Sequence, residues 1–299
     1  MSGFSAGWLT LREPADTAAR SRRATRSITD ALAHDAAPSV LDLAAGTGSN
    51  LRYLADELRG EQRWLLVDHD PSLLMRVRPA TASWAESRGY NANGDADSLW
   101  LRGGRLDCRV STRCLDLASL DDPALFADTT LVTASALLDL VSESWLLVLA
   151  GRCREGGAAA LFALIYDGRI VCAPEEPEDE LVRALVNRHQ HTDKGFGEAL
   201  GPDAAGGAER CFVSLGYRVE RDASDWVLTS EAGELQRQLI AGWAEAAVAM
   251  APEHSASIRG WRDRRLAHVS AGRSRLVVGH QDLTALPPTP PKRSRPFFR

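Results

Sequence analysis

Hydrophobic residues from position 38 onward fall into short apolar runs separated by segments with helical spacing. The runs 40–45 and 63–68 flank a stretch in which Leu51, Leu54 and Leu58 recur every three or four residues. A short apolar run predicts a buried strand and the longer spacing predicts a helix, so these residues are expected to form a strand–helix–strand unit. By the same criteria we expect further strands at residues 109–115, 130–134, 158–166, 217–229 and 274–284.

Helical segments alternate with these strands. Asp70 and Pro71 are residue types that favour the N-cap and the first position of a helix. The alternation predicts an α/β fold: a doubly wound, mostly parallel seven-stranded sheet with helices on both faces and a helical insertion before the last strand. We expect the other helices at residues 16–32, 142–153, 177–191, 231–250 and 254–270, and a glycine-rich loop at residues 194–207.

Composition narrows the function only modestly. The net charge of −5 argues against a general binder of nucleic acid or anionic membranes. The five cysteines form no C-x-x-C pair, which favours reduced thiols over a zinc site or a disulfide framework. The first residues lack the apolar core of a secretory signal, and the longest apolar run, 158–166, is far shorter than the roughly 20 residues of a membrane-spanning helix. We therefore expect a cytoplasmic protein.

A glycine-containing turn follows the first expected strand, in the sequence VLDLAAGTGSN at residues 40–50. Gly46 and Gly48 let a ligand approach the backbone closely, and the start of the next helix offers free amides to an anion. Leu51 stands where the dinucleotide-binding pattern needs a third glycine. Asp42, just before the turn, would repel a pyrophosphate and attract an ammonium group. The turn therefore favours a ligand with both an ammonium and a carboxylate, which is an amino acid.

Acidic residues also follow the next two strands. Asp68 ends the second strand, 20 residues after Gly48, where an acid can accept from both ribose hydroxyls of an adenosine ligand. Asp116 follows the third strand and can accept from the exocyclic amine of adenine. An amino acid joined to adenosine is S-adenosylmethionine (SAM). We expect Asp68→Ala to weaken SAM binding by about 10- to 150-fold and to cost the ligand-free protein little stability.

These motifs resemble those of the class I SAM-dependent methyltransferases. The first motif of that family, D/E-x-G-x-G-x-G, matches residues 42–48, with Ala44 in place of the first glycine. The resemblance covers about residues 38–166 and implies a Rossmann-like domain with SAM as cofactor. It implies that Asp68 binds ribose, and that His69, Asp116 and the Leu117 amide contact adenine. The complete set of expected cofactor-binding residues is Asp42, Ala44, Gly46, Gly48, Asp68, His69, Asp116, Leu117 and Ser135.

The segment before the first strand is expected to cover this site. Residues 1–37 would form a helical cap, as in many methyltransferases of this fold, with Arg12 meeting the methionine carboxylate; without residues 1–30 the protein should fold but bind SAM more weakly. Residues 38–285 would form the methyltransferase domain. Its inserted helices, at about 231–270, would pack on the sheet or form a dimer face, and the proline-rich basic residues 286–299 would be a disordered tail.

The methyl acceptor is expected to be a small molecule. The N/D-P-P-Y/F motif of enzymes that methylate nucleobase amines is missing after the fourth strand, and so is the Pro-Cys nucleophile of cytosine C5 methylation. Asp139 and His191 are the candidates for a general base or for orienting the acceptor. His189, His191 and Asp193 have the residue types of a metal site, but no third histidine or cysteine stands at ligand spacing, so no metal is expected. The segment 187–197 is otherwise part of an acceptor pocket or a polar helix end.

Alternatives to a small-molecule methyltransferase remain. An RNA or protein methyltransferase would have a basic acceptor groove, and a SAM-binding protein without catalysis would have a closed acceptor pocket. A nicotinamide oxidoreductase is disfavoured, because Leu51 breaks the dinucleotide fingerprint and no Y-x-x-x-K pair is present. No membrane partner is expected, nucleic acid is disfavoured, and a homodimer is allowed.

Overall fold

The computed structural model describes residues 5–58, 60–95 and 98–288. Its strands are β1 (Ser39–Leu43), β2 (Gly60–Asp68), β3 (Asn91–Gly94), β4 (Leu99–Gly103), β5 (Leu106–Cys114), β6 (Leu131–Ser135), β7 (Ala159–Ala173), β8 (Arg218–Ala223), β9 (Trp226–Leu228) and β10 (Arg275–Leu286). Its α-helices are α1 (Ala6–Ala19), α2 (Arg22–Leu32), α3 (Ser49–Leu58), α4 (Pro71–Ser87), α5 (Glu143–Gly156), α6 (Asp179–Gln190), α7 (Ala204–Ser214), α8 (Gly233–Met250) and α9 (Ser255–Ser270). The 3-10 helices are η1 (Pro123–Phe126), η2 (Leu138–Leu140), η3 (Gly201–Asp203), η4 (Ser230–Ala232) and η5 (Pro252–His254).

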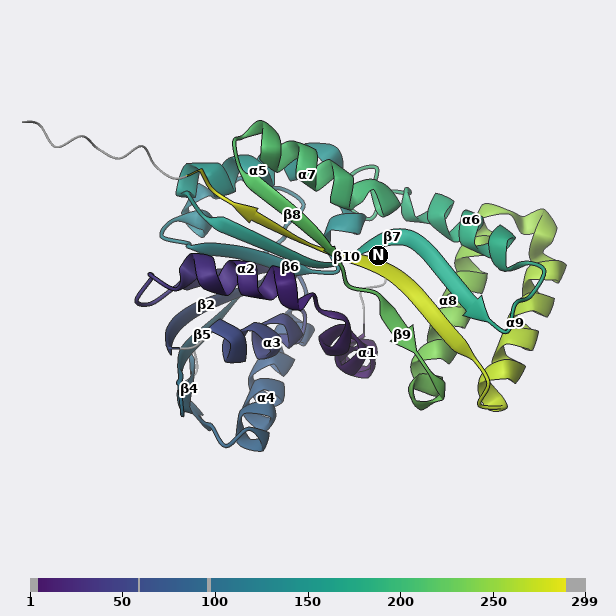
Figure 1. Cartoon of the computed structure of the whole chain (residues 1–299), viewed down its shortest axis with the longest axis horizontal. Helices are drawn as coiled ribbons and strands as arrows, with labels where there is room; N and C mark the ends of the chain where they lie inside the picture. Colours follow the sequence, from purple (N-terminus) through teal and green to yellow (C-terminus); the bar gives the residue numbers. More distant parts are fainter. Residues whose placement is uncertain (1–4, 59, 96–97, 289–299) are drawn as a thin grey trace, which may run out of the picture.

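One sheet of ten strands forms the centre of the described chain (Figure 1). β5, β2, β1, β6 and β7 lie side by side in that order and run parallel. β10 lies antiparallel beside β7, and β8 lies antiparallel beside β10. These seven strands correspond to the seven that the sequence predicts, so the predicted fold class is confirmed.

Three strands were not expected. β3 and β4 form a hairpin that extends the sheet beyond β5, within residues that carry several glycines. β9 pairs with β10 after a short break at Ser224 and Asp225, so the single strand expected at residues 217–229 is two strands. Both differences come from backbone pairing at the margins of the sheet, which the apolar pattern does not report.

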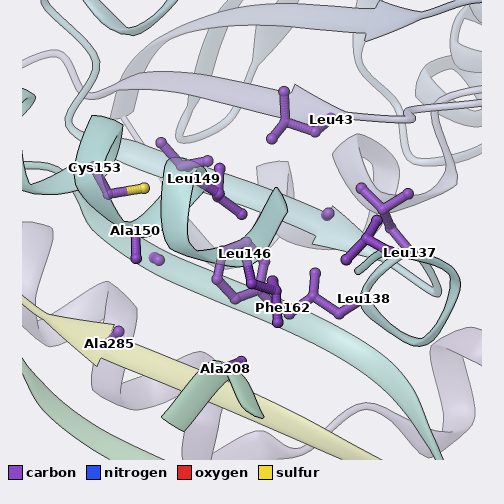
Figure 2. Packing of buried hydrophobic residues seen from close by; sticks show 14 of the residues in the cluster. Leu43, Leu137, Leu138, Leu146, Leu149, Ala150, Cys153, Phe162, Ala208 and Ala285 are labelled. Atoms are coloured by element: carbon purple, nitrogen blue, oxygen red, sulfur yellow. The ribbon is translucent and has the colours of Figure 1, made fainter. Parts of the chain in front are cut away.

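Helices cover both faces of the sheet centre. α2, α3 and α4 bury Ile28, Leu51 and Val77 on one face. α5 and α7 bury Leu146 and Phe212 on the other face. Figure 2 shows part of this second layer, where Leu146 of α5 lies beside Phe162 of β7, and Leu149 and Cys153 belong to the same buried cluster. The expected two-layer covering is therefore present over the parallel strands β1, β6 and β7.

The inserted helices form a separate packing layer. β7 and β10 continue beyond the parallel strands, and α6, α8 and α9 pack against this extension (Figure 1). Trp261 of α9, which is fully buried, donates to Asp179 at the start of α6. The fully buried Arg265 of α9 pairs with the same carboxylate. The helical insertion expected before the last strand is confirmed, and it packs on the sheet.

The N-terminal segment contains two helices where the sequence predicts one at residues 16–32. The break lies at Arg20 and Ser21, where Ser21 caps α2 by accepting from the Ala24 amide. The Ser21 amide donates to the fully buried Asp282 of β10 at 2.9 Å, and Arg20 approaches the same carboxylate at 3.5 Å. A tertiary contact therefore fixes the helix break.

Two other segments, a loop and the C-terminal tail, were also predicted from the sequence. The expected loop at residues 194–207 ends earlier, because Gly206 and Gly207 lie inside α7, and Gly207 allows its close approach to Leu200. The expected disordered tail falls mostly on residues 289–299, which lie outside the described residues. Among the residues that the structure describes, no helix has the length and apolar character needed to cross a membrane.

Candidate functional site

Backbone strain is concentrated where β1, β6 and β7 lie side by side. Ala44 follows β1, Ala136 follows β6 and Leu164 lies within β7, and these non-glycine residues have φ values of 53°, 53° and 55°. A left-handed conformation costs an L-residue roughly 1–2 kcal/mol, and such residues cluster at functional sites. Ala44 stands where the family motif has a glycine, and it keeps a conformation that glycine adopts without this cost.

The glycine turn contacts the end of β2 and helix α1. The Gly46 amide donates to Asp68 Oδ2 at 2.8 Å, so the turn is fixed to the end of β2. Gly46 has a φ of 54°, and a Cβ atom added there would lie 2.9 Å from Leu9 Cδ1 of α1. Glycine adopts this conformation without strain, and Leu9 packs directly on the turn.

Asp42 is fully buried at the end of β1. Its Oδ1 accepts from Asn50 Nδ2 at 2.9 Å, whereas its Oδ2 has no hydrogen-bond partner. Burial raises the pKa of this carboxyl to about 7, against a lowering by the Asn50 hydrogen bond and by the charge of Arg20. A buried carboxylate oxygen without a partner is costly. It is the kind of group that a ligand ammonium would satisfy.

Asp68 is buried and already has protein partners. Besides the Gly46 amide on Oδ2, its Oδ1 accepts from the Asp70 amide at 3.0 Å, and His69 Nδ1 lies 3.3 Å from Oδ1. Each carboxylate oxygen has a second lone pair, so ribose hydroxyls could still be accepted. The expectation that losing Asp68 costs the ligand-free protein little stability assumed that its partner is the ligand. Because two backbone amides donate to this carboxylate, we instead expect its loss to destabilise the ligand-free protein.

The expected adenine contacts lie at the ends of β2 and β5. His69 and Asp116 are both exposed, and Asp116 Oδ1 accepts from the Ala118 amide at 2.9 Å. The Leu117 side chain is buried, and its carbonyl accepts from Trp145 Nε1 at 2.7 Å. Cys114 lies opposite Asp68 in the β2–β5 register, and it is the exposed one among five free cysteines.

Helix α1 lies over this edge of the sheet. Glu13 forms a two-point ion pair with the buried Arg52 of α3, with distances of 2.7 and 2.5 Å. Arg12, which the sequence suggests for the methionine carboxylate, instead pairs with Asp16 at 2.9 Å and stacks 5.0 Å from the centre of the Trp226 ring. Its guanidinium is therefore engaged within the protein.

Arg20 is the residue near Asp42 that the motifs did not indicate. Its Nη1 donates to Asn50 Oδ1 at 2.8 Å, and Asn50 in turn donates to Asp42. Arg20 Nη2 is buried without a hydrogen-bond partner. The sequence alone does not distinguish Arg20 from the many other arginines. Its burial depends on the contact between Ser21 and Asp282, which are far apart in the sequence.

Asp139 lies on η2, directly after β6. Its Oδ1 is buried without a hydrogen-bond partner. Burial raises the pKa of Asp139 to about 6, with smaller opposing effects from the nearby charges of Arg12 and Lys194. The carboxylate is thus ionised at neutral pH and has one oxygen able to accept a proton or a hydrogen bond.

His191 faces a different set of groups. Its Nδ1 lies 3.2 Å from the Ala199 carbonyl and its Nε2 lies 3.9 Å from Asp203 Oδ2. The ammonium of Lys194 contacts the His189 carbonyl at 3.0 Å and Thr192 Oγ1 at 2.7 Å. Burial lowers the pKa of Lys194 and of His189. The charges of Lys194 and Asp139 act on each other's pKa, which makes Lys194 the residue of the segment 187–197 with an electrostatic link to Asp139.

Within the described ranges, the molecule has no cluster of three or more histidine, cysteine, aspartate or glutamate side chains that could hold a metal ion. The residues 189–193 form the end of α6 and the start of its following loop, and their side chains bond mainly to local backbone groups.

Comparisons with known proteins give matches at the level of solved structures. No protein-family model matches the chain, and no curated protein matches it. A SAM-dependent methyltransferase from Geobacter sulfurreducens in complex with S-adenosyl-L-homocysteine is 14% identical, with a TM-score of 0.44 over 96% of this chain and 100% of that chain. A SAM-dependent methyltransferase from Thiobacillus denitrificans, also with S-adenosyl-L-homocysteine, is 13% identical, with a TM-score of 0.42 over 95% and 99%.

The similar structures also include the [4+2]-cyclase SpnF, which is 16% identical with a TM-score of 0.40 over 90% of this chain and 82% of that chain. At identities and TM-scores this low, a function is inferred from the residues of this chain and not from the similar structures.

Proposed function

We propose that this protein is a SAM-dependent methyltransferase that transfers a methyl group to a small-molecule acceptor. The observation that carries the proposal is the buried, unpartnered oxygen of Asp42 beside a glycine turn with left-handed backbone. A ligand ammonium would satisfy that oxygen, and it would replace the burial cost of a lone carboxylate by a charge-assisted hydrogen bond.

The arrangement of the neighbouring residues supports the same ligand. Asp68 ends the strand beside β1, and Asp116 follows the strand after that, in the order that an adenosine would need. The antiparallel pair of last strands beside β7 agrees with the usual topology of the family that the motifs resemble. An amino acid joined to adenosine would therefore extend from Asp42 across β2 toward Asp116.

Each expected cofactor residue has a role in this proposal. Asp42, with the turn residues Ala44, Gly46 and Gly48, would hold the methionine end. Asp68 would accept from the ribose hydroxyls. The remaining members of the set would line the adenine and the approach to the methyl group: His69, Asp116, Leu117 and Ser135. SAM, when bound, supplies an electrophilic methyl group on a sulfonium.

The residues of the chain would position the acceptor and exclude water, which is most of what an in-line methyl displacement needs. Asp139 is the better candidate for contact with the acceptor, because its Oδ1 is buried, unpartnered and ionised above a pKa of about 6. It could accept a hydrogen bond or a proton from the nucleophile. His191 remains a candidate only for orienting the acceptor.

Calorimetry with SAM and with S-adenosylhomocysteine tests cofactor binding directly. We expect both to bind and NADPH not to compete, because Asp68 would repel a 2′-phosphate. Labelled methyl transfer from SAM into fractionated cell extract tests catalysis. Binding without transfer to any fraction would indicate the non-catalytic alternative, and no binding of either ligand would overturn the proposal.

Cys114 provides a test of where SAM binds. It is exposed opposite Asp68, whereas Cys108, Cys153, Cys172 and Cys211 are buried. S-adenosylhomocysteine should slow alkylation of Cys114 by iodoacetamide, measured by mass spectrometry of the peptide. Equal alkylation with saturating ligand would contradict the proposed adenine position.

A further inference from the structure

Within residues 5–58, 60–95 and 98–288, one face of the sheet at β4, β5 and β2 is not covered by helices. The helices that pack on β2, β4 and β5 are α3 and α4, and they bury Trp64, Leu101 and Val110 on one face. Side chains alternate along a strand, so the residues between these point to the opposite face. The open face consists of Glu61, Arg63, Trp100, Arg102, Asp107 and Arg109.

Parallel strands are normally buried on both faces, so an open face on β2 and β5 needs an explanation. Arg63 and Arg109 are exposed, and Trp100 is half-buried. The Arg109 guanidinium lies 5.4 Å from the centre of the Trp100 ring, which confirms that both side chains share this face. An aromatic residue and arginines at the centre of an exposed patch are the composition of a protein–protein interface.

The charges of β2 and β5 on the open face are arranged in two rows, and Arg102 of β4 lies beside Asp107 at the end of the acidic row. Arg63 of β2 lies directly opposite Arg109 of β5, and Glu61 lies directly opposite Asp107. Like charges that face each other across neighbouring strands are destabilising. Asp107 pairs with Arg102 at 3.2 Å. Within the described residues, Arg63 and Arg109 form no ion pair, and they contact the Ala37 carbonyl and Ser98 Oγ respectively.

The two rows make the open face complementary in charge to the same face of a second copy. Both strands have an acid followed two residues later by an arginine, Glu61 and Arg63 on β2, Asp107 and Arg109 on β5. The rows are separated by about 7 Å, which is two residues of strand rise. If two copies stack with a two-fold axis between the rows, each acidic row meets the basic row of the partner, and a two-fold interface uses the same patch on both copies.

We propose that the open face is the contact surface of a homodimer, in which β2 and β5 stack antiparallel on the same strands of a second copy. Glu61 would pair with Arg63 across the interface, and Asp107 would pair with Arg109. The proposal does not depend on the methyltransferase function. A polyanion such as single-stranded nucleic acid fits less well, because the acidic row would repel it at the same distance from the basic row.

Charge reversal tests the proposal. The first variant, Arg63→Glu with Arg109→Glu, makes both rows acidic, and the second, Glu61→Arg with Asp107→Arg, makes both basic. Each variant alone should be a monomer by sedimentation equilibrium, with the dissociation constant raised by about 100-fold or more over the wild type, because like charges then oppose each other. An equimolar mixture of the two variants should form a heterodimer.

A matched control variant reverses Arg22 and Arg26 to glutamate, since both are exposed on α2, away from the open face. It should dimerise like the wild type. Two results would overturn the proposal: a wild type that stays monomeric at its highest soluble concentration, or a dimer that persists in both variants. A monomeric wild type that binds a labelled single-stranded oligonucleotide, and loses it on Arg63→Glu with Arg109→Glu, would assign the face to a polyanion instead.

Discussion

At the scale of single residues, Asp42 shows how a site can lower the stability of its own protein. Its pKa is raised from 3.8 to about 7 by burial, so the ionised carboxylate is disfavoured in the folded state. A group with a raised folded pKa favours folding fully below its unfolded pKa and loses that contribution as the pH rises through the folded value. The free energy of unfolding should therefore fall between pH 4 and pH 7 on account of Asp42.

Asp42→Asn removes this dependence, because asparagine does not ionise and can still accept from Asn50. We expect the variant to melt like the wild type near pH 4 and at a higher temperature near pH 8, measured by thermal unfolding without ligand. SAM binding should weaken by about 10- to 150-fold, because a charge-assisted hydrogen bond is lost. A variant that is less stable than the wild type at both pH values would show that the carboxylate is satisfied in a way the structure does not contain.

Asp68 combines a structural and a binding role. Asp68→Asn keeps one acceptor oxygen for the amides of Gly46 and Asp70 and loses the other. The variant should be destabilised by about 1–3 kcal/mol, the cost of one unsatisfied buried amide, and should bind SAM more weakly. Urea unfolding without ligand and calorimetry at a temperature where the variant is folded measure the two effects separately. Unchanged SAM affinity in the folded variant would place the ribose elsewhere.

At the scale of elements, helix α1 is the segment that would cover the candidate cofactor site. The N-terminal cap over the cofactor site remains a prediction, and the structure limits the segment that could act as the cap to helix α1. Ile28 of α2 is fully buried in the core, and Arg20 and Ser21 bond to buried groups, so removing residues 1–30 would take away part of the core. α1 is the part whose contacts with the glycine turn can be changed alone.

Leu9→Ala should loosen the cover without removing the helix. Leu9 packs on Gly46, whereas Glu13 continues to hold α1 to Arg52. We expect S-adenosylhomocysteine to dissociate about tenfold faster, the equivalent of roughly 1.4 kcal/mol of lost contact, in stopped-flow displacement. Leu9→Met, which nearly preserves volume, is the matched control and should release ligand at the wild-type rate. Equal rates in all three proteins would mean that α1 does not close over the ligand.

At the scale of the whole molecule, Asp282 joins segments that are distant in sequence. It is fully buried, and it accepts from the Leu164 amide at 2.8 Å and from the Ser21 amide at 2.9 Å. It therefore links β10, the left-handed residue of β7 and the start of α2. Its loss affects the N-terminal segment, the strained strand and the sheet together.

Asp282→Ala should destabilise the protein by about 3–5 kcal/mol, the cost of breaking a buried charged contact. The control is Asp222→Ala on the neighbouring strand β8. Asp222 is only partly buried and accepts from Ser21 Oγ at 2.5 Å, so its loss should cost about 1 kcal/mol. Chemical denaturation of both variants makes the comparison. Similar losses in the two would show that Asp282 does not hold these segments together.

Much of the fold was predictable from local patterns. The seven main strands, the helix start at Asp70 and the inserted helices follow from apolar spacing and from residue types at helix ends, because these signals act within a few residues. The turn residues 44–48 were predictable for the same reason. The hairpin β3–β4 was not predicted, since β3 buries no side chain, although Leu99 and Leu101 of β4 are buried at strand spacing.

The same distinction between local patterns and tertiary contacts applies to the candidate site. The sequence alone determined which residues stand at the ends of the strands, because strand order and residue type fix Asp42, Asp68 and Asp116 there. Only the tertiary structure decided what each can do. Burial leaves one oxygen of Asp42 without a partner. The Gly46 amide engages Asp68 across 22 residues, and Trp226 donates to Asp16, the partner of Arg12, across 210 residues. Solvent exclusion and pairing are properties of the packed chain, and no local pattern contains them.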